Sequence, residues 1–382
     1  MNKITTPALL LVACSLAGAA HGQSGITVYG IVDAAVTATD QGGPGSAKVM
    51  SLSSGIMSGS LFGLQGKEEL GGGMRAIFQL EASYESDTGA MKTYYGNPST
   101  ATPVATGGAP VTGLFNRRAF VGLEGGFGSL TLGRDYTPIY FTVLDGDSLK
   151  FGSYGNMQSV VLLSGTGSDR FGRASNALFY TAPRIGTLQA RLMASLGSES
   201  GGAPGSPPRD ANRMWGVSLS HAAGGLFVSG AYQRIALPLV AGTPLTFTGL
   251  TGIRSDTSVA AKYVLDDYTL SGGYFRTLLP MPRGDGDALW LGGAVRMGVG
   301  MLSLNLQRLR QQALQGATKQ GTGLGVAYMY TLSKRTTLYA SYGQMNNNGA
   351  AAFSVLSGDT AVAPAGAGAL VRALALGTRH LF

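Results

Sequence analysis

The sequence predicts an all-β fold, a closed antiparallel barrel of about sixteen strands, and three observations support it. Apolar and polar residues alternate with period two along most of the chain. Tight turns and long connections follow each other in regular order. The 382 residues are 44% hydrophobic and 13% charged and include one Cys, which is typical of a folded chain rather than a disordered or disulfide-stabilised one.

Period-two alternation is clear in the segment 186–196. Every second residue from Leu188 to Leu196 is apolar, whereas Gln189, Arg191 and Ser195 on the other parity are polar. This two-faced pattern indicates a strand. We expect strands, with approximate limits, at 26–38, 60–69, 74–86, 115–125, 128–136, 174–182, 186–196, 212–222, 226–236, 256–265, 268–277, 287–297, 301–310, 320–332, 336–346 and 369–382.

The connections between these segments alternate in length. Tight turns are expected at 71–73, 125–126, 183–184, 223–225, 266–267, 298–300 and 333–334. Longer loops rich in Gly, Pro, Ser and Thr are expected at 40–59, 87–114, 137–173, 197–211, 237–255, 278–286, 311–319 and 347–368. Strands of about ten residues with short turns at one end and long loops at the other indicate a transmembrane β-barrel of the outer-membrane type.

Membrane insertion also explains which face of each strand is apolar. After residue 20 no apolar run reaches the length of about 18 residues that a spanning helix needs, so a helical membrane protein is excluded. A sheet in hydrocarbon cannot leave an edge of unpaired amides, which predicts one closed barrel with its apolar side chains facing lipid. About sixteen strands leave an aqueous bore, and the size therefore indicates a channel.

Residues 1–22 have the pattern of an export signal. Lys3 provides a basic start, an apolar stretch runs over 8–20, and small residues flank His21 before a cleavage site ahead of Gln23. We therefore expect a removed signal peptide at 1–22 and a single barrel domain at 23–382. The segment 11–14, which ends at Cys14, leaves open a lipoprotein cleavage site. Removal of 1–22 leaves 27 basic and 20 acidic residues, a net charge of +7.

Signals for catalysis, metals and nucleic acid are weak. His221 and His380 remain after cleavage, and neither has a plausible catalytic or metal-binding cluster around it. The positive charge is spread over strands and loops instead of forming a basic stripe with stacking aromatics. We expect no enzymatic activity, no cofactor, no metal site and no nucleic-acid partner.

Several motifs in order resemble one family. The final strand ends in Phe382, in parity with Leu374 and Leu376, which resembles the signal that outer-membrane assembly machinery reads. The segments 26–33, 62–81, 116–124, 128–134 and 332–343 closely resemble the general porins of Gram-negative bacteria, particularly the β-proteobacterial branch. The resemblance covers the whole mature chain.

The resemblance implies a homotrimer of sixteen-stranded barrels, each with its third long loop folded inward as a constriction. In this chain that loop is 137–173, the longest of the set. Porins of this kind place wall arginines opposite carboxylates on the inserted loop. Arg117 and Arg173 match two wall arginines, Arg134 follows a matching Leu-Gly motif, and Glu81 matches a carboxylate among them.

The acidic partners expected on loop 137–173 are Asp145 and Asp147. Each predicted pore residue has an alternative interpretation. Arg117 and the adjacent Arg118 should face opposite sides of a strand, so one of them can lie at the lipid interface. Arg134 can lie at the barrel rim, and Arg173 can be a solvated loop charge.

The chain departs from the family pattern at two positions. Leu61 occupies a place where Arg is usual, and Gln65 one where a basic residue is common, which predicts a thinner basic wall. We expect an outer-membrane porin for passive diffusion of small hydrophilic solutes and ions, with a preference for anions and with small anionic and neutral solutes as its cargo. The alternatives are a substrate-specific porin, or a barrel that acts mainly as a surface receptor or adhesin.

Overall fold

The computed structural model describes residues 25–46, 48–92, 94–95, 110–111, 113–163, 171–197, 208–241, 246–279, 284–313 and 316–382. The expected signal peptide, 1–22, lies outside these residues. Among the described residues, no helix has the length and apolar character needed to cross a bilayer.

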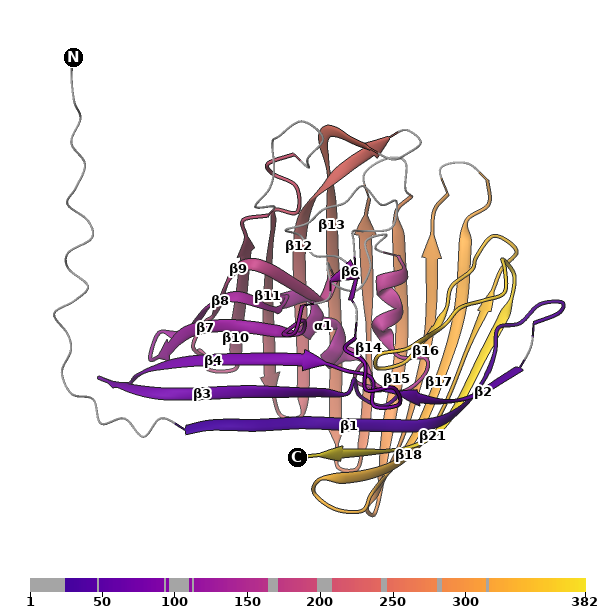
Figure 1. Ribbon diagram of the computed structural model, residues 1–382, viewed down its shortest axis with the longest axis horizontal. Helices are drawn as coiled ribbons and strands as arrows, with labels where there is room; N and C mark the ends of the chain where they lie inside the picture. The colour runs from indigo at the N-terminus through magenta and orange to yellow at the C-terminus, as the bar shows by residue number, and fades with distance from the viewer. Residues whose placement is uncertain are drawn as a thin grey trace.

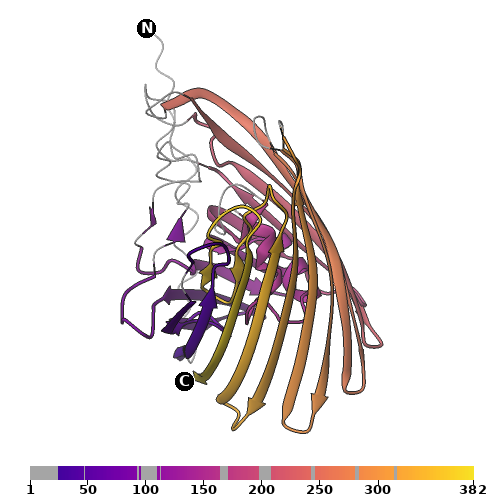
Figure 2. The same cartoon turned by 90° about the vertical axis from the view of Figure 1, so that its right-hand side faces the viewer.

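Sixteen antiparallel strands form one closed barrel (Figures 1 and 2). Each strand pairs with the next along the chain, and β1 pairs with β21 from Ile31↔Leu381 to Asp40↔Arg372 to close the sheet. The strands are β1 (Gly25–Asp40), β3 (Leu61–Gly71), β4 (Met74–Ser83), β7 (Arg118–Gly125), β8 (Gly128–Tyr136), β9 (Arg173–Thr181), β10 (Leu188–Ser195), β11 (Met214–Ala223), β12 (Leu226–Ala241), β13 (Thr246–Leu265), β14 (Tyr268–Leu278), β15 (Gly286–Met297), β16 (Gly300–Gln311), β17 (Lys319–Thr331), β18 (Thr336–Asn347) and β21 (Leu370–Leu381). The predicted fold class is confirmed.

The prediction of a long loop at 237–255 is wrong. β12 continues to Ala241 and β13 begins at Thr246, so the two strands form one long hairpin. The β-branched and aromatic residues of 246–253 favour strand, and this propensity prevails over the glycines among them. Short strands also occur within other expected loops, namely β2 (Lys48–Ser54), β5 (Tyr94–Tyr95), β6 (Pro110–Val111), β19 (Val355–Leu356) and β20 (Ala361–Val362).

The two faces of the strands have the polarity that lipid requires. On β16, Leu304 and Leu306 are exposed on the outside, while Asn305 and Gln307 face inward and are buried. Inward polar residues are buried because a loop packs against this wall. The apolar outer face and polar inner face are those of a membrane barrel.

The loop after β8 folds into the barrel. It contains α1 (Pro138–Gly146) and the 3-10 helix η1 (Met157–Leu162). Thr137 caps α1 by accepting a hydrogen bond from the Tyr140 N–H, and Pro138 suits the first helical position. Figure 1 shows α1 against the inner side of the wall.

Hydrogen bonds fix this loop to the wall of the barrel. The indole N–H of Trp290 donates to the Gly146 carbonyl at 2.9 Å. Asn305 and Gln307 donate to the Gly155 carbonyl at 3.0 and 2.8 Å. The loop backbone thus accepts hydrogen bonds from three side chains of β15 and β16, and these bonds position the loop across the lumen.

A second insertion was not expected from the sequence. The connection between β18 and β21 carries the β19–β20 hairpin, and Phe353, Val355 and Val362 are buried in the same apolar cluster as the loop after β8. The Gly155 N–H donates to the Leu356 carbonyl at 2.9 Å. Two loops therefore narrow the lumen together.

Candidate functional site

A cavity of about 290 Å³ lies between the inserted loops and the wall formed by β1 and β3. Three basic side chains and one carboxylate line it: Arg117, Lys150, Arg173 and Asp359. The apolar part of its lining includes Leu61 of β3. Position 61, where Arg is usual in the family that the chain resembles, therefore faces the lumen.

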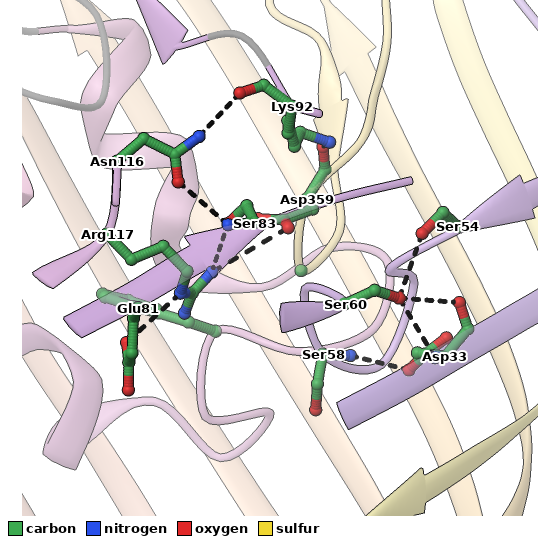
Figure 3. A network of polar contacts seen from close by, with 12 residues as sticks. Asp33, Ser54, Ser58, Ser60, Glu81, Ser83, Lys92, Asn116, Arg117 and Asp359 are labelled. Carbon is green, nitrogen blue, oxygen red and sulfur yellow. Dashed lines mark hydrogen bonds and ion pairs between the residues drawn. The ribbon is translucent and has the colours of Figure 1, made fainter. Parts of the chain in front are cut away.

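Arg117 is the centre of the charged contacts. It directly precedes β7, and its Nε lies 3.6 Å from Glu81 Oε2. Its Nη2 donates to the Tyr136 hydroxyl at 2.9 Å, and its Nη1 lies 3.9 Å from Asp359 Oδ2. Figure 3 shows the guanidinium of Arg117 between Glu81 and Asp359.

Arg173 approaches the same tyrosine from the start of β9. Its Nη2 donates to the Tyr136 hydroxyl at 3.0 Å, and its guanidinium carbon lies 4.7 Å from the centre of the Tyr136 ring. The Tyr136 ring stacks on Tyr140 of α1 at a centroid distance of 4.2 Å. Tyr136 thus joins Arg117 and Arg173 to each other and to the inserted helix.

Glu81 is 7% exposed and lies beside these arginines on β4. Besides the ion pair with Arg117, it accepts hydrogen bonds from the Tyr29 hydroxyl at 2.7 Å and from Gln79 Nε2 at 3.0 Å. The structure thus brings Glu81, Arg117 and Arg173 together, as three of the six predicted site residues.

Arg118 also reaches inward, which the sequence analysis missed. It makes a two-pronged ion pair with Asp135 at 2.7 and 2.8 Å, and its Nη1 donates to Gln79 Oε1 at 2.7 Å. Adjacent residues alternate faces only within a strand, and β7 begins at Arg118, so Arg117 is free of that constraint. Arg118 lies two residues before Phe120, which faces inward on the same strand. This shared parity is the sequence signal that could have identified Arg118 as inward-facing.

Arg134 lies apart from this group. Its Nε donates to the Asn116 carbonyl and its Nη1 to Ser175 Oγ, both at 2.8 Å. On β8 it has the parity of Leu132, which is 54% exposed on the outer face. A register shift between Gly133 and Asp135 separates it from the inward-facing end of the strand.

The two predicted loop carboxylates have partners within their own loop. Asp145 pairs with Lys150 at 3.2 Å. Asp147 is 1% exposed and accepts backbone N–H bonds from Leu149, Phe151 and Met157 at 3.1, 2.9 and 3.1 Å. Burial raises the pKa of Asp147, while the three N–H groups act in the opposite direction.

The carboxylate that approaches the wall arginine comes from the last loop. Asp359 follows β19, and its backbone N–H donates to the Gly55 carbonyl at 2.8 Å. Lys92 donates to the backbone carbonyl of Asp359. Figure 3 shows Lys92, Asp359 and Arg117 in one continuous polar network. The sequence contains no signal that this loop folds inward.

A buried carboxylate at the base of the network holds the 55–60 segment. Asp33 of β1 is fully buried, accepts from the Ser58 N–H at 2.9 Å, and accepts from the Tyr339 hydroxyl at 2.5 Å. The Ile56 carbonyl accepts from the N–H groups of Ser153 and Gly358 at 2.8 and 2.9 Å. The segment 55–60 therefore connects the two inserted loops to the wall.

Comparisons with known proteins identify the family. A family profile described as Gram-negative porin matches residues 8–350. The chain belongs to the Gram-negative porins. Outer membrane porin protein 32 of Delftia acidovorans is 27% identical over 386 residues, which cover 98% of this chain and 99% of the relative. An outer membrane porin protein of Bordetella pertussis is 25% identical over 393 residues, with 91% of this chain and 95% of the relative covered.

Solved structures agree with this assignment. The anion-selective porin from Comamonas acidovorans superposes with a TM-score of 0.77 at 26% identity, over 94% of this chain and all of the other. The protein is thus a porin of the outer membrane, and its barrel encloses a channel.

Proposed function

We propose that this porin passes small hydrophilic solutes by diffusion and prefers anions, with Arg117, Arg173 and Glu81 at its constriction. One observation carries the proposal: the 290 Å³ cavity beside the inserted loops is lined by three basic side chains and one carboxylate. Basic side chains that line a pore attract anions and repel cations. The anion-selective porin from Comamonas acidovorans is a relative with the same fold.

Solute flux through reconstituted vesicles tests this proposal. Vesicles that contain the porin are loaded with impermeant polymer and mixed with isotonic solutes of similar size, one neutral, one anionic and one cationic. The anionic solute is expected to swell the vesicles fastest. Equal rates for the anionic and cationic solutes would refute the anion preference, and no swelling with any solute would refute diffusion.

We also infer that the porin is a homotrimer. β7 and β10 have eight residues each, and β8 and β9 nine. At about 3.4 Å per residue and a tilt of about 45°, eight residues rise about 19 Å, less than the apolar band of about 25 Å. This low wall needs a protein neighbour, and its outer leucines, such as Leu132 at 54% exposure, provide an apolar contact. Sedimentation of the detergent-solubilised porin as a monomer would contradict the trimer.

Three predictions from the sequence accompany the proposal. The signal peptide is cleaved ahead of Gln23, which mass determination of the mature porin checks. Phe382 is recognised by the assembly machinery, so its removal should lower the amount of folded porin in the outer membrane. No enzymatic activity is expected.

A further inference from the structure

A second cavity, of about 160 Å³, lies between α1 and the inner face of the wall formed by β7 to β10 (Figure 1). It has no described lining residue in common with the 290 Å³ cavity. Ser129 and Thr181, which line it, pair with each other near the short turns, and Thr181 pairs with Arg191 on β10. The short turns of such barrels are periplasmic. The second cavity is therefore on the periplasmic side of the inserted helix.

Aromatic rings form much of the lining, and we term this space the aromatic cavity. The rings belong to Phe120 of β7, Tyr136 of β8, Phe141 of α1 and Phe179 of β9. Tyr136 and Phe141 meet edge to face, with ring centres 6.0 Å apart. An apolar cavity of about 150 Å³ in a protein holds one benzene molecule. The volume and the lining of the aromatic cavity therefore suit a single six-membered ring.

The charges that line the aromatic cavity leave one cation uncompensated. Arg118 and Asp135 are joined by their two-pronged ion pair, so their charges cancel. Arg191 is half-buried, and its guanidinium carbon lies 4.8 Å from the centre of the Phe141 ring. It makes no hydrogen bond or ion pair with any other residue that the structure describes. The carboxylate of Asp145 on α1 pairs with Lys150.

Donors for an anionic group lie around this guanidinium. Arg191 offers a planar fork of N–H groups that matches the two oxygens of a carboxylate. The hydroxyls of Ser129, Thr131 and Thr181 also line the aromatic cavity. Ligand sites in proteins are mostly apolar and aromatic, with a few polar groups that fix the orientation of the ligand. The aromatic cavity has this composition.

We propose that the aromatic cavity binds an aromatic monocarboxylate during its passage through the porin. The ring of the solute lies among Phe120, Phe141 and Phe179, and its carboxylate accepts hydrogen bonds from Arg191. One negative charge on the solute matches the one uncompensated cation. An Arg191 that served only to pack on Phe141 would not distinguish a carboxylate from a neutral alcohol. The proposal rests on the channel inside the barrel and is independent of the ion preference of the constriction.

Equilibrium binding of three small solutes tests the proposal. The folded porin in detergent is titrated calorimetrically at low ionic strength with benzoate, with acetate and with benzyl alcohol. Acetate has the carboxylate without the ring, and benzyl alcohol has the ring without the charge. Benzoate is expected to bind with a dissociation constant at least about tenfold smaller than those of the other two, because it alone gains both ring burial and charge-assisted hydrogen bonds.

Two variants separate the contributions of charge and ring. In Arg191→Gln, benzoate should bind no more tightly than benzyl alcohol. In Phe141→Leu, the affinity for benzoate should fall toward that for acetate. Arg191→Lys keeps the charge without the fork and should weaken benzoate binding, which serves as the test if Arg191→Gln does not fold.

A matched control removes a cation that makes the same kind of contact elsewhere in the lumen. Lys262 of β13 is half-buried, and its Nζ lies 5.3 Å from the centre of the Phe227 ring, outside the aromatic cavity. Lys262→Gln should therefore leave benzoate binding unchanged. Equal affinities of the wild-type porin for benzoate and acetate, or wild-type benzoate binding by folded Arg191→Gln, would overturn the proposal. The zero-current potential of the same samples in a salt gradient reports separately on the ion preference of the channel.

Discussion

Arg117 and Arg173 both donate to the hydroxyl of Tyr136, at 2.9 and 3.0 Å. Replacement of both by Ser should therefore widen the passage beside the inserted loops and weaken anion preference. A charge about 4 Å from a passing anion in water contributes about 1 kcal/mol, so the selectivity ratio should fall by about fivefold for each charge lost. Planar-bilayer conductance with bulky neutral solutes and with salt gradients measures both effects. Parental conductance and selectivity in a folded double variant would contradict the assignment.

Leu61→Arg should act in the opposite sense. Leu61 lines the same cavity as Arg117, so a guanidinium at this position enters the passage. We expect a smaller conductance and a stronger anion preference, by about the same factor for one added charge. Leu61→Met, similar in length and uncharged, is the control. An unchanged selectivity with a correctly folded barrel would show that the new side chain does not reach the path of the ions.

Asp359→Asn tests the carboxylate that the last loop contributes. The change removes the single negative charge that lines the cavity, and so should raise anion preference. It keeps the backbone hydrogen bond to Gly55, so the loop should stay in place. Asp145→Asn is a suitable comparison, because Asp145 pairs with Lys150 in the other inserted loop. Lower anion preference in Asp359→Asn would contradict a direct electrostatic role for Asp359.

At the scale of the element, Asp147 holds the loop after β8 in its shape. Asp147→Ala leaves three buried N–H groups without their acceptor, which should destabilise the loop by about 1–3 kcal/mol for each group left unsatisfied. The closed barrel does not depend on this loop for strand pairing. We therefore expect flickering, larger single-channel currents with an unchanged thermal transition of the barrel. Single-channel currents of wild-type size without flickering would show that the apolar contacts of the loop suffice to hold it in its shape.

Elements whose pattern is local were predictable from the sequence. The prediction of a strand at 128–136 agrees with β8 at Gly128–Tyr136. The glycines before this strand mark where it begins, and the alternation of apolar and polar residues shows how far it extends. The inward fold of the last loop was not predictable. Phe353 and Val355 belong to a short apolar stretch at 350–356, and the contact with the loop after β8 that buries them is not visible in the sequence.

The candidate site was predictable only in part, namely for the residues that belong to motifs of the family. Family motifs pointed to Glu81, Arg117 and Arg173; in the structure Arg117 pairs with Glu81, and both arginines donate to Tyr136. The partners of loop carboxylates depend on the local fold of the loop, which has no period in its sequence. Asp147 consequently has backbone partners, and Asp359, from a loop more than 200 residues further along the chain, approaches Arg117.

At the scale of the whole molecule, the central claim is that a barrel narrowed by two loops exposes an excess of positive charge to the ions that pass. The most direct measurement is the zero-current potential of the purified porin in a gradient of potassium chloride. Both sides must stay below about 0.15 M, where the screening length is about 8 Å or longer, because higher salt hides the lumen charges. We expect a potential whose sign shows that chloride crosses the porin more readily than potassium. A potential of the sign set by potassium would contradict it.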